Sequence, residues 1–290
     1  MTYPLGRNRY GKTGVRLATV VRDRDRHRFT DLDLEVLLEG DFDAAHIEGD
    51  NAAVLPTDTM RGTCTALARD GVEHVAVYLQ RVVDRLFVAS PAVTRIRMRA
   101  VSHPWERIEV DGVPHAHGFR PAAGGSSVTT LIQDREGSAA LTGGVQGLRL
   151  LKTTGSAFSG YPKDRYTTLP ETRERIMATT VESTWATTAA DLDHTRLASA
   201  VPATFSAAFV THDDSESLQH TLHTMGSAVL DAHPEVSWIR FRMPNEHHNL
   251  ADLSVYGLDN PNEVYVVAGD PSGLIEGVVA REGVEPPLAW

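Results

Sequence analysis

The chain has 290 residues, of which 41% are hydrophobic and 23% are charged, and its formal net charge is −10 at pH 7. No apolar run approaches the ~20 residues of a membrane-spanning helix, and the acidic balance leaves no broad basic face for a nucleic-acid backbone. The single Cys64 excludes an internal disulfide and any Cys-x-x-Cys site. We therefore expect a globular protein of one or two domains, with neither a membrane nor nucleic acid as partner.

Two strands and two helices are predicted in the first 90 residues. Alternating polarity at residues 15–22 and 29–39 indicates an antiparallel pair of half-buried strands. Thr57 or Asp58, both good N-caps, should begin a helix that Asp70-Gly71 ends. A second, amphipathic helix should follow. Its apolar face comprises Val75, Leu79, Val82, Val83 and Leu86.

More strands complete the first half of the chain. Apolar residues alternate with arginines at residues 95–100, and a hairpin from 105 to 119 should turn at Asp111-Gly112. The first half thus has the order ββααββ. The Gly-rich segment 121–127 is the best linker candidate, so we divide the chain into a first unit at 1–122 and a second at 123–290.

The second half repeats this order around an irregular insertion. Four strands with two helices on one face leave open sheet edges. We therefore expect an α+β fold of two ββααββ units whose sheets close against other subunits. The expected strands lie near 128–134, 142–152, 181–188, 236–243, 250–256, 263–268 and 274–280, and the helices near 193–211 and 215–232.

The irregular insertion, residues 151–179, is the segment best suited to binding a ligand. It is rich in Gly, Ser, Thr and Pro, so it cannot serve regular burial, and polar loops on a rigid scaffold often carry binding groups. Phe158 stands in it among small residues. Its ring either fills a gap in a neighbouring element or stacks on a flat ligand.

The same insertion resembles a family signature. From Ser156 to Leu169 the pattern Ser-x-Phe-x-Gly-aromatic-x-x-Asp-x-Tyr-Thr-Thr-Leu is similar to that of the urate oxidase (uricase) family, including its bacterial members. Further matches follow in the family's order: Tyr10-Gly11-Lys12, Gly49-Asp50-Asn51, Thr57-Asp58-Thr59, Pro244-Asn245-Glu246-His247-His248, Asp259-Asn260-Pro261-Asn262-Glu263 and Gly273-Leu274-Ile275-Glu276. The resemblance therefore covers nearly the whole chain.

The resemblance implies a fold, a reaction and an assembly. Members of this family contain two tandem tunnelling-fold (T-fold) units per chain, whose sheets join into a barrel, and they form homotetramers with active sites at subunit interfaces. They oxidise urate with O2 to 5-hydroxyisourate and hydrogen peroxide in purine degradation. They use no metal or other cofactor, so urate, O2 and further copies of the chain are the expected partners.

The resemblance also implies the site residues. The expected catalytic residues are Lys12, Thr57 and His247, which relay protons. The expected substrate-binding residues are Thr57, Asp58, Phe158, Arg175, Leu218, Gln219 and Asn245. In the family the phenyl ring stacks on urate, the arginine and glutamine hold its edges, the residues matching Asp58 and Leu218 contribute backbone N–H groups, and the asparagine holds O2 or water.

Residue types alone give plainer alternatives for the same side chains. Lys12, Arg175 and Gln219 could each be solvated, and Thr57 could be a helix cap. The chemistry nevertheless suits a purine, because a guanidinium pairs in bidentate fashion and an amide both donates and accepts. Period 2 places Asn245 and His247 on one side of the chain, with Glu246 and His248 on the other. Glu246 replaces a more usual lysine, which leaves its effect on His247 open.

The residue types are compatible with two alternative functions. His115 and His117 lie two apart on an expected strand, so their rings share a face, and His212, His247 and His248 supply further imidazoles. A metal-dependent T-fold enzyme acting on purines or pterins is therefore one alternative. A non-catalytic purine-binding protein is the other; it would keep Phe158 and the amide and guanidinium contacts but has no use for the proton relay.

The two ends of the chain bear on its location. The first residues, MTYPLGRNRYGK, have no apolar region typical of a secretory signal. The last residues, Pro-Pro-Leu-Ala-Trp, differ from a peroxisomal tripeptide of the Ser-Lys-Leu type. We expect a cytoplasmic protein.

Overall fold

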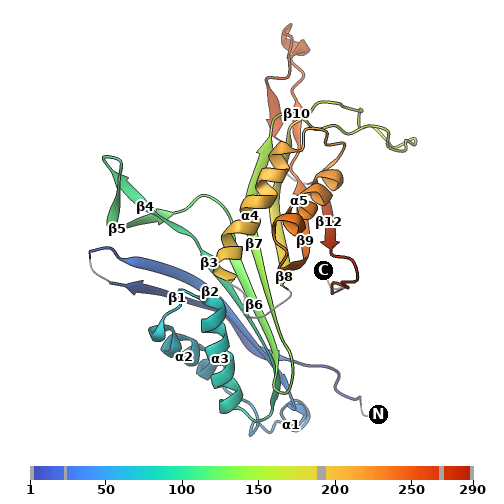
Figure 1. The fold of residues 1–290 in the computed structure, drawn as a ribbon. Helices are drawn as coiled ribbons and strands as arrows, with labels where there is room; N and C mark the ends of the chain where they lie inside the picture. The colour runs from blue at the N-terminus through green and yellow to red at the C-terminus, as the bar shows by residue number, and fades with distance from the viewer. Residues whose placement is uncertain (1–2, 23–24, 188–193, 268–270, 288–290) are drawn as a thin grey trace. The chain divides into compact units, whose positions relative to one another are not determined.

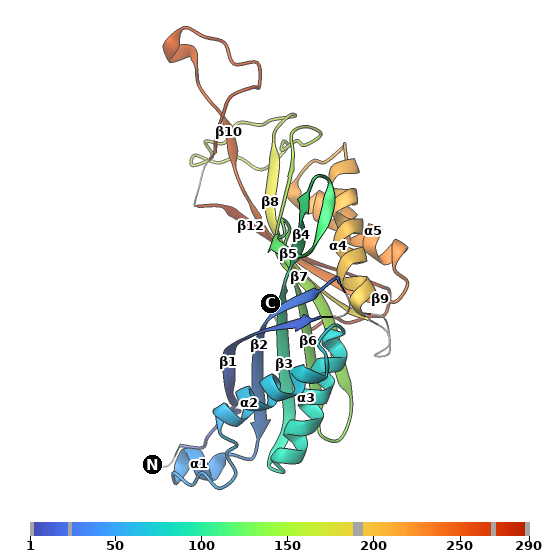
Figure 2. The ribbon, with the colours of Figure 1, turned by 90° about the vertical axis from the view of Figure 1, so that its left-hand side faces the viewer.

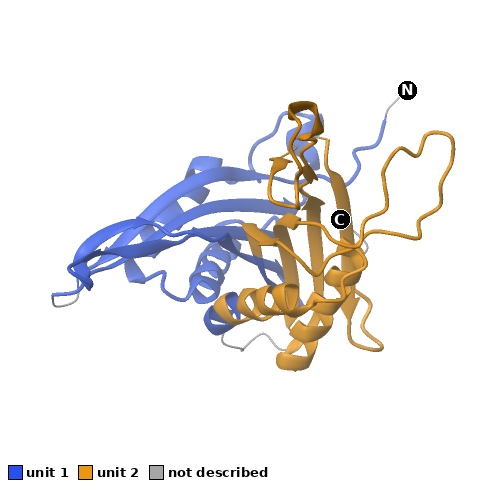
Figure 3. Ribbon diagram, turned by 90° about the horizontal axis from the view of Figure 1, so that it is seen from above, with its two compact units in different colours: residues 1–144, 189–198 blue, residues 145–188, 199–290 orange. Residues whose placement is uncertain are grey.

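The computed structural model describes residues 3–22, 25–187, 194–267 and 271–287 (Figure 1). The chain divides into two compact units (Figure 3). Unit 1 comprises residues 1–144 and 189–198, and unit 2 comprises residues 145–188 and 199–290. The expected α+β class is confirmed, since each unit combines antiparallel strands with helices. The division at 122 and 123 stays a prediction.

Unit 1 contains an antiparallel sheet in the order β1-β2-β3-β6. Helices α2 and α3 cover one face of this sheet (Figure 2). The strands are β1 (Tyr10–Val21), β2 (Arg28–Gly40), β3 (Val93–His103) and β6 (Ser126–Asp134), and the helices are α1 (Asp43–Ile47), α2 (Thr57–Leu67) and α3 (Val75–Ala89). A 3-10 turn, Ala68–Asp70, follows α2, and Gly71 then ends the helical run with a φ of 98°.

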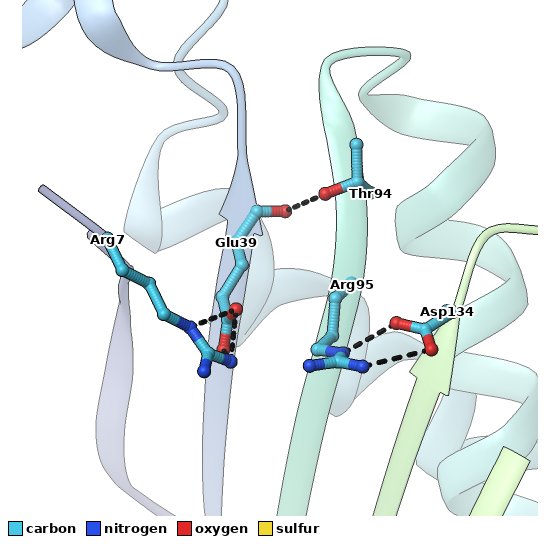
Figure 4. Close-up of polar contacts among 5 residues, drawn as sticks. All are labelled: Arg7, Glu39, Thr94, Arg95 and Asp134. Carbon is cyan, nitrogen blue, oxygen red and sulfur yellow. Dashed lines mark hydrogen bonds and ion pairs between the residues drawn. The ribbon is translucent and has the colours of Figure 1, made fainter.

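The core of unit 1 follows the predicted periodicities. Alternate residues of β2, from Leu32 to Leu38, are buried, and so are Leu79, Val82, Val83 and Leu86 of α3. The arginines of β3 face away from this core and pair with acids on both neighbouring strands. Arg97 pairs with Glu35 of β2 and Arg95 with Asp134 of β6, and Figure 4 shows the second pair beside that of Arg7 and Glu39.

One predicted cap is wrong. Pro56, not Thr57 or Asp58, holds the N-cap position of α2, and its carbonyl accepts from the N–H of Thr59 at 2.9 Å. Pro56 has an extended backbone (φ −56°, ψ 137°), and Thr57 is the first residue of the helix. The helix thus begins one residue earlier than a cap at Thr57 implies, and two earlier than a cap at Asp58 implies. The Asp58 carboxylate instead pairs with Arg61 at 2.8 Å.

The predicted hairpin is confirmed, but it does not complete the large sheet. Strands β4 (Trp105–Val110) and β5 (Val113–Pro121) pair across a turn at Asp111 and Gly112, both with positive φ. They form a separate two-stranded sheet. The fourth strand beside β3 is β6, which the sequence assigned to the second unit. Its register with β3 places Arg95 opposite Asp134, so a long-range ion pair accompanies the pairing.

In unit 2, strands β8, β9 and β12 are neighbours in an antiparallel sheet, and α5 packs on β9 and β12. β7 carries the chain from unit 1 into unit 2. The elements are β7 (Ala139–Lys152), β8 (Met177–Thr187), α4 (His194–Thr211), α5 (Leu218–Ala232), β9 (Val236–Asn245) and β12 (Gly273–Ala280). Gly226 allows the close approach of α5, because a Cβ there would lie 2.4 Å from a methyl of Val279.

The strand predicted at 250–256 is wrong. β10 is confined to His248–Leu250 and pairs with β11 (Tyr265–Val267). A 3-10 turn, Ser254–Tyr256, follows instead of a strand. The Asp252 carboxylate accepts from the backbone N–H and the hydroxyl of Ser254, and Gly257 has a φ of 70°. Such local bonds favour a turn over a strand. Within the described ranges, every helix falls short of the length and apolarity that crossing a membrane requires.

Candidate functional site

Unit 2 contains a pocket of about 670 Å³, a size that suits a small ring-shaped ligand. It lies between the irregular insertion, the start of α5, the end of β9 and the start of β12. Six residues expected to bind or transform a substrate line it: Phe158, Arg175, Leu218, Gln219, Asn245 and His247. The structure therefore brings together side chains that are up to 89 positions apart in the sequence, from 158 to 247.

Phe158 is held at the pocket by backbone hydrogen bonds on both sides. Its own N–H donates to the carbonyl of Thr172 at 2.8 Å, and the N–H of Ala157 donates to the carbonyl of Ser215 at 2.7 Å. The ring is half-buried and stacks on Tyr161 with 4.9 Å between centroids and 19° between planes. The ring thus packs on a neighbouring side chain and also lines the pocket, and its contact with a ligand stays a prediction.

Arg175 lines the pocket beside the Phe158 ring. Its guanidinium carbon lies 5.7 Å from the centroid of the Phe158 ring. Within the described part of the chain, its buried Nε has no hydrogen-bond partner. Burial also lowers the pKa of the guanidinium, although an arginine stays protonated at any physiological pH. A buried donor without an acceptor costs about 1–3 kcal/mol, and a ligand acceptor in the pocket would remove that cost.

The start of α5 forms another wall of the pocket. Ser217 is the N-cap, and its hydroxyl accepts from the N–H of His220 at 3.1 Å. Leu218 and Gln219 are the first two helical residues, so their N–H groups have no acceptor within the helix. The Leu218 side chain is buried, whereas that of Gln219 is exposed at the pocket. This end of a helix favours an anion or a carbonyl oxygen.

The end of β9 supplies Asn245 and His247. Asn245 is the last residue of the strand and lies opposite Thr179 and Gly273 in its two neighbours. Glu246 points away from the pocket, because its carboxylate pairs with Arg149 at 2.7 Å and accepts from Thr180. The predicted alternation is confirmed for these three residues.

The prediction for His248 is wrong, since this residue also lines the pocket. β9 ends at Asn245, so the two-residue period is not maintained to position 248. The His248 Nδ1 instead lies 3.1 Å from the carbonyl oxygen of Glu246.

The other predicted residues belong to unit 1 and do not line this pocket. Lys12 is half-buried on β1 opposite Val36, immediately before a bulge. Thr57 is half-buried in the first turn of α2, and Asp58 beside it is exposed. The hydroxyl of Tyr10 donates to the carbonyl of Leu55 at 3.1 Å, which ties β1 to the segment entering α2.

Several pocket residues were not predicted, among them Ile176, Asn262, Tyr265 and Ile275. Asn262 and Ile275 lie in the matched motifs at 259–263 and 273–276, for which no role was predicted. In the motif at 259–263, the Asn260 side chain donates to the carbonyls of Ala251 and Val264, so it holds together the segment 251–264, which includes Asn262.

Some histidines do gather, as the sequence indicated. The ring centroids of His115 and His117 are 4.5 Å apart, and His27 lies 5.7 Å from His117. Across the described residues, however, no group of three or more His, Cys, Asp or Glu is placed to hold a metal ion.

Each of the two units combines antiparallel strands with helices, as expected for a T-fold protein, and the second unit contains the candidate pocket. The family model for uricase matches residues 8–130 and 141–276. The uricase of Arthrobacter globiformis is 42% identical over 96% of this chain and 90% of its own length, and that of Danio rerio is 31% identical over 95% and 94%. The chain belongs to the uricase family.

Solved structures agree with this assignment. A crystal structure of the Arthrobacter globiformis uricase matches 99% of this chain and 98% of its own length, with a TM-score of 0.94 and 39% identity. A urate oxidase from Bacillus sp. TB-90 matches with a TM-score of 0.81 at 18% identity, a likeness that supports the fold alone. Both the fold class and the resemblance to urate oxidases are confirmed. The family match favours urate oxidation over the two alternative functions.

Proposed function

We propose that this protein oxidises urate and that the pocket of unit 2 binds the substrate. One observation carries the assignment of the site. A guanidinium whose buried Nε has no partner among the described residues lies 5.7 Å from the centroid of an aromatic ring, in a pocket of about 670 Å³. A flat purine that stacks on Phe158 would bring its ring oxygen and nitrogen to Arg175. A bidentate contact of this kind is strong because the donor is charged.

The remaining walls fit the other edges of urate. The Gln219 amide can both donate and accept, and the N–H groups that begin α5 favour an electron-rich oxygen. Asn245, the last residue of β9, and His247, two residues beyond it, both line the pocket, and their side chains suit O2 or the water that reacts. These roles assign substrate binding to Phe158, Arg175, Leu218, Gln219 and Asn245.

The reaction is a two-electron oxidation. Urate, O2 and water give 5-hydroxyisourate and hydrogen peroxide: urate loses two electrons, water supplies the hydroxyl oxygen, and O2 is reduced to the peroxide. Removing a proton from urate makes the ring electron-rich, so a base and a dry site allow the substrate itself to reduce O2. Lys12, Thr57 and His247 are the proposed proton relay, and no cofactor is needed.

The proposed site residues lie in two different units, which leads to a proposal about assembly. Lys12, Thr57 and Asp58 belong to unit 1, whereas the pocket is lined by unit 2 alone. Antiparallel sheets also leave edges that need a partner. We therefore propose a homotetramer in which each site combines Lys12, Thr57 and Asp58 of one subunit with the unit 2 pocket of its neighbour, His247 included, and the sheets form a barrel. A cytoplasmic location stays a prediction from the sequence.

The direct test uses purified protein with urate. Loss of the near-ultraviolet absorption of urate, uptake of O2 and formation of peroxide should occur together in equal amounts. The same protein treated with a strong chelator and then freed of it should keep its activity. If chelation abolished turnover and an added metal restored it, the cofactor-free mechanism would be wrong. If urate bound but was not consumed, the non-catalytic alternative would hold.

A further inference from the structure

Lys152, the last residue of β7, is a buried cation that the proposed mechanism does not use. Only 8% of its surface is exposed. Its Nζ donates to the carbonyl of Gly155 at 3.0 Å and to that of His212 at 2.5 Å, and it lies 5.8 Å from the centroid of the Phe209 ring. Lysine is almost never fully buried without a partner, and here two carbonyl oxygens accept from the ammonium.

These two carbonyls belong to two segments that each lead to residues lining the pocket. Gly155 lies three residues before Phe158, and His212 begins the connection from α4 to the N-cap Ser217 of α5. The same two segments pair directly, because Ser156 and Ser215 form a parallel bridge and the N–H of Ala157 donates to the carbonyl of Ser215. One ammonium therefore joins the segment that carries the aromatic ring to the segment that carries Leu218 and Gln219.

The residues around the Lys152 hydrogen bonds are tightly packed. Gly155 has a φ of 68°, and a Cβ there would lie 3.0 Å from the carbonyl oxygen of Asp213. The Thr221 hydroxyl, fully buried on α5, lies 2.7 Å from the Ser215 hydroxyl and 3.3 Å from the Nδ1 of His212. The hydrogen bonds of Lys152 are thus part of a buried polar cluster between the two segments.

We propose that Lys152 is a positioning residue, whose ammonium fixes the distance between the Phe158 ring and the start of α5. The proposal rests on the proposed function for its effect on urate, but its effect on the two segments is independent of any ligand. A purine held between a ring and an amide binds well only if both lie at the right separation. Loss of the ammonium should therefore loosen the segment and weaken substrate binding, with less effect on the chemical step.

The test compares three variants of the full-length protein. Lys152→Met keeps the apolar stem but removes the donors, Lys152→Arg keeps charge and donors, and Lys163→Met makes the same change at an exposed lysine of the insertion. The Lys163 ammonium is exposed; it pairs with Glu171 at 2.9 Å and lies 5.5 Å from the centroid of the Tyr161 ring. Contacts of an exposed cation contribute little, so its loss should matter little. Urate binding is measured without O2 by calorimetry, and turnover is measured with O2.

Lys152→Met should raise the Kd for urate about tenfold and change kcat at saturating urate less than threefold. Lys152→Arg should recover most of the affinity, and Lys163→Met should stay within twofold of the original protein. Equal urate affinity in Lys152→Met and the original protein would overturn the proposal. The proposal would also be overturned if Lys152→Met lost kcat and urate affinity in the same proportion and Lys152→Arg restored neither.

Hydrogen exchange separates this proposal from the proposed function. In the original protein, the amides of Ala157 and Phe158 are hydrogen-bonded, so they should exchange slowly, and Lys152→Met should speed their exchange at least tenfold without any ligand. If the original protein did not bind urate, the proposed function would fail while this measurement still decided the role of Lys152. Should Lys152→Met not fold, Thr221→Val tests the same cluster at constant volume; unchanged exchange at these amides would then overturn the proposal.

Discussion

Replacing Arg175 should weaken urate binding and stabilise the unliganded protein. The substitution Arg175→Met keeps an apolar stem but removes the guanidinium. Two charge-assisted hydrogen bonds, each worth about 1.5–3 kcal/mol, should be lost from the complex. Water that enters the pocket can replace part of these hydrogen bonds. We therefore expect the binding free energy of urate to weaken by about 2–4 kcal/mol, which raises the Kd roughly 30- to 700-fold.

Arg175→Met should weaken urate binding but increase the stability of the unliganded protein. The buried Nε of Arg175 has no partner among the described residues, and an unpaired buried donor costs about 1–3 kcal/mol. Without a ligand, the melting temperature of Arg175→Met should therefore rise by roughly 2–4 °C per kcal/mol recovered. Arg175→Lys, which keeps the charge but not the planar fork, should bind urate with intermediate affinity.

Two measurements test this reasoning: calorimetry with urate in the absence of O2, and thermal unfolding without ligand. Arg173→Met is the matched control, because Arg173 is exposed and does not line the pocket. It should leave both quantities unchanged. If Arg175→Met lowered the melting temperature and bound urate as tightly as the original protein, the guanidinium would be a structural brace and our assignment of the pocket would be refuted.

Three further predictions concern the relay, the assembly and pH. Lys12→Ala or Thr57→Ala should lower kcat about 10²-fold or more with little change in the Kd for urate; a loss of affinity as large as that of Arg175→Ala would contradict the division of roles. Thr57→Ala and Arg175→Ala, each inactive alone, should regain part of the activity when unfolded and refolded together, whereas mixed oligomers without activity would place the whole site in one chain. Burial, with His220 and Lys152 nearby, lowers the pKa of His212, so the unfolded chain binds more protons below its ordinary pKa of about 6.5. Stability should therefore fall as the pH drops from that value, and urea unfolding of His212→Asn at pH 7 and 5.5 should show a smaller loss; equal losses would argue against this role.

The sequence by itself determined most of the local structure. The alternation in β2 and the helical spacing in α3 identify the buried faces because period 2 and period 3.6 follow from backbone geometry. Asp111-Gly112 identifies its hairpin turn because both residues tolerate a positive φ. The family motifs also indicated which side chains would meet in unit 2, and six of them do line one pocket.

Tertiary structure alone decided what depends on distant partners. β6 joins β3 through a register that includes the pair of Arg95 and Asp134, 39 positions apart, and no local pattern encodes such a choice. Two further features are equally invisible in the sequence: the Arg175 Nε, which has no partner among the residues that the structure describes, and the burial of Lys152. Both depend on segments from elsewhere in the chain. In the sequence, Lys152 and Arg175 both look like solvated cations. Only the fold removes water from them, and a hydrogen bond that is formed or missing affects the free energy of folding strongly only where water is excluded.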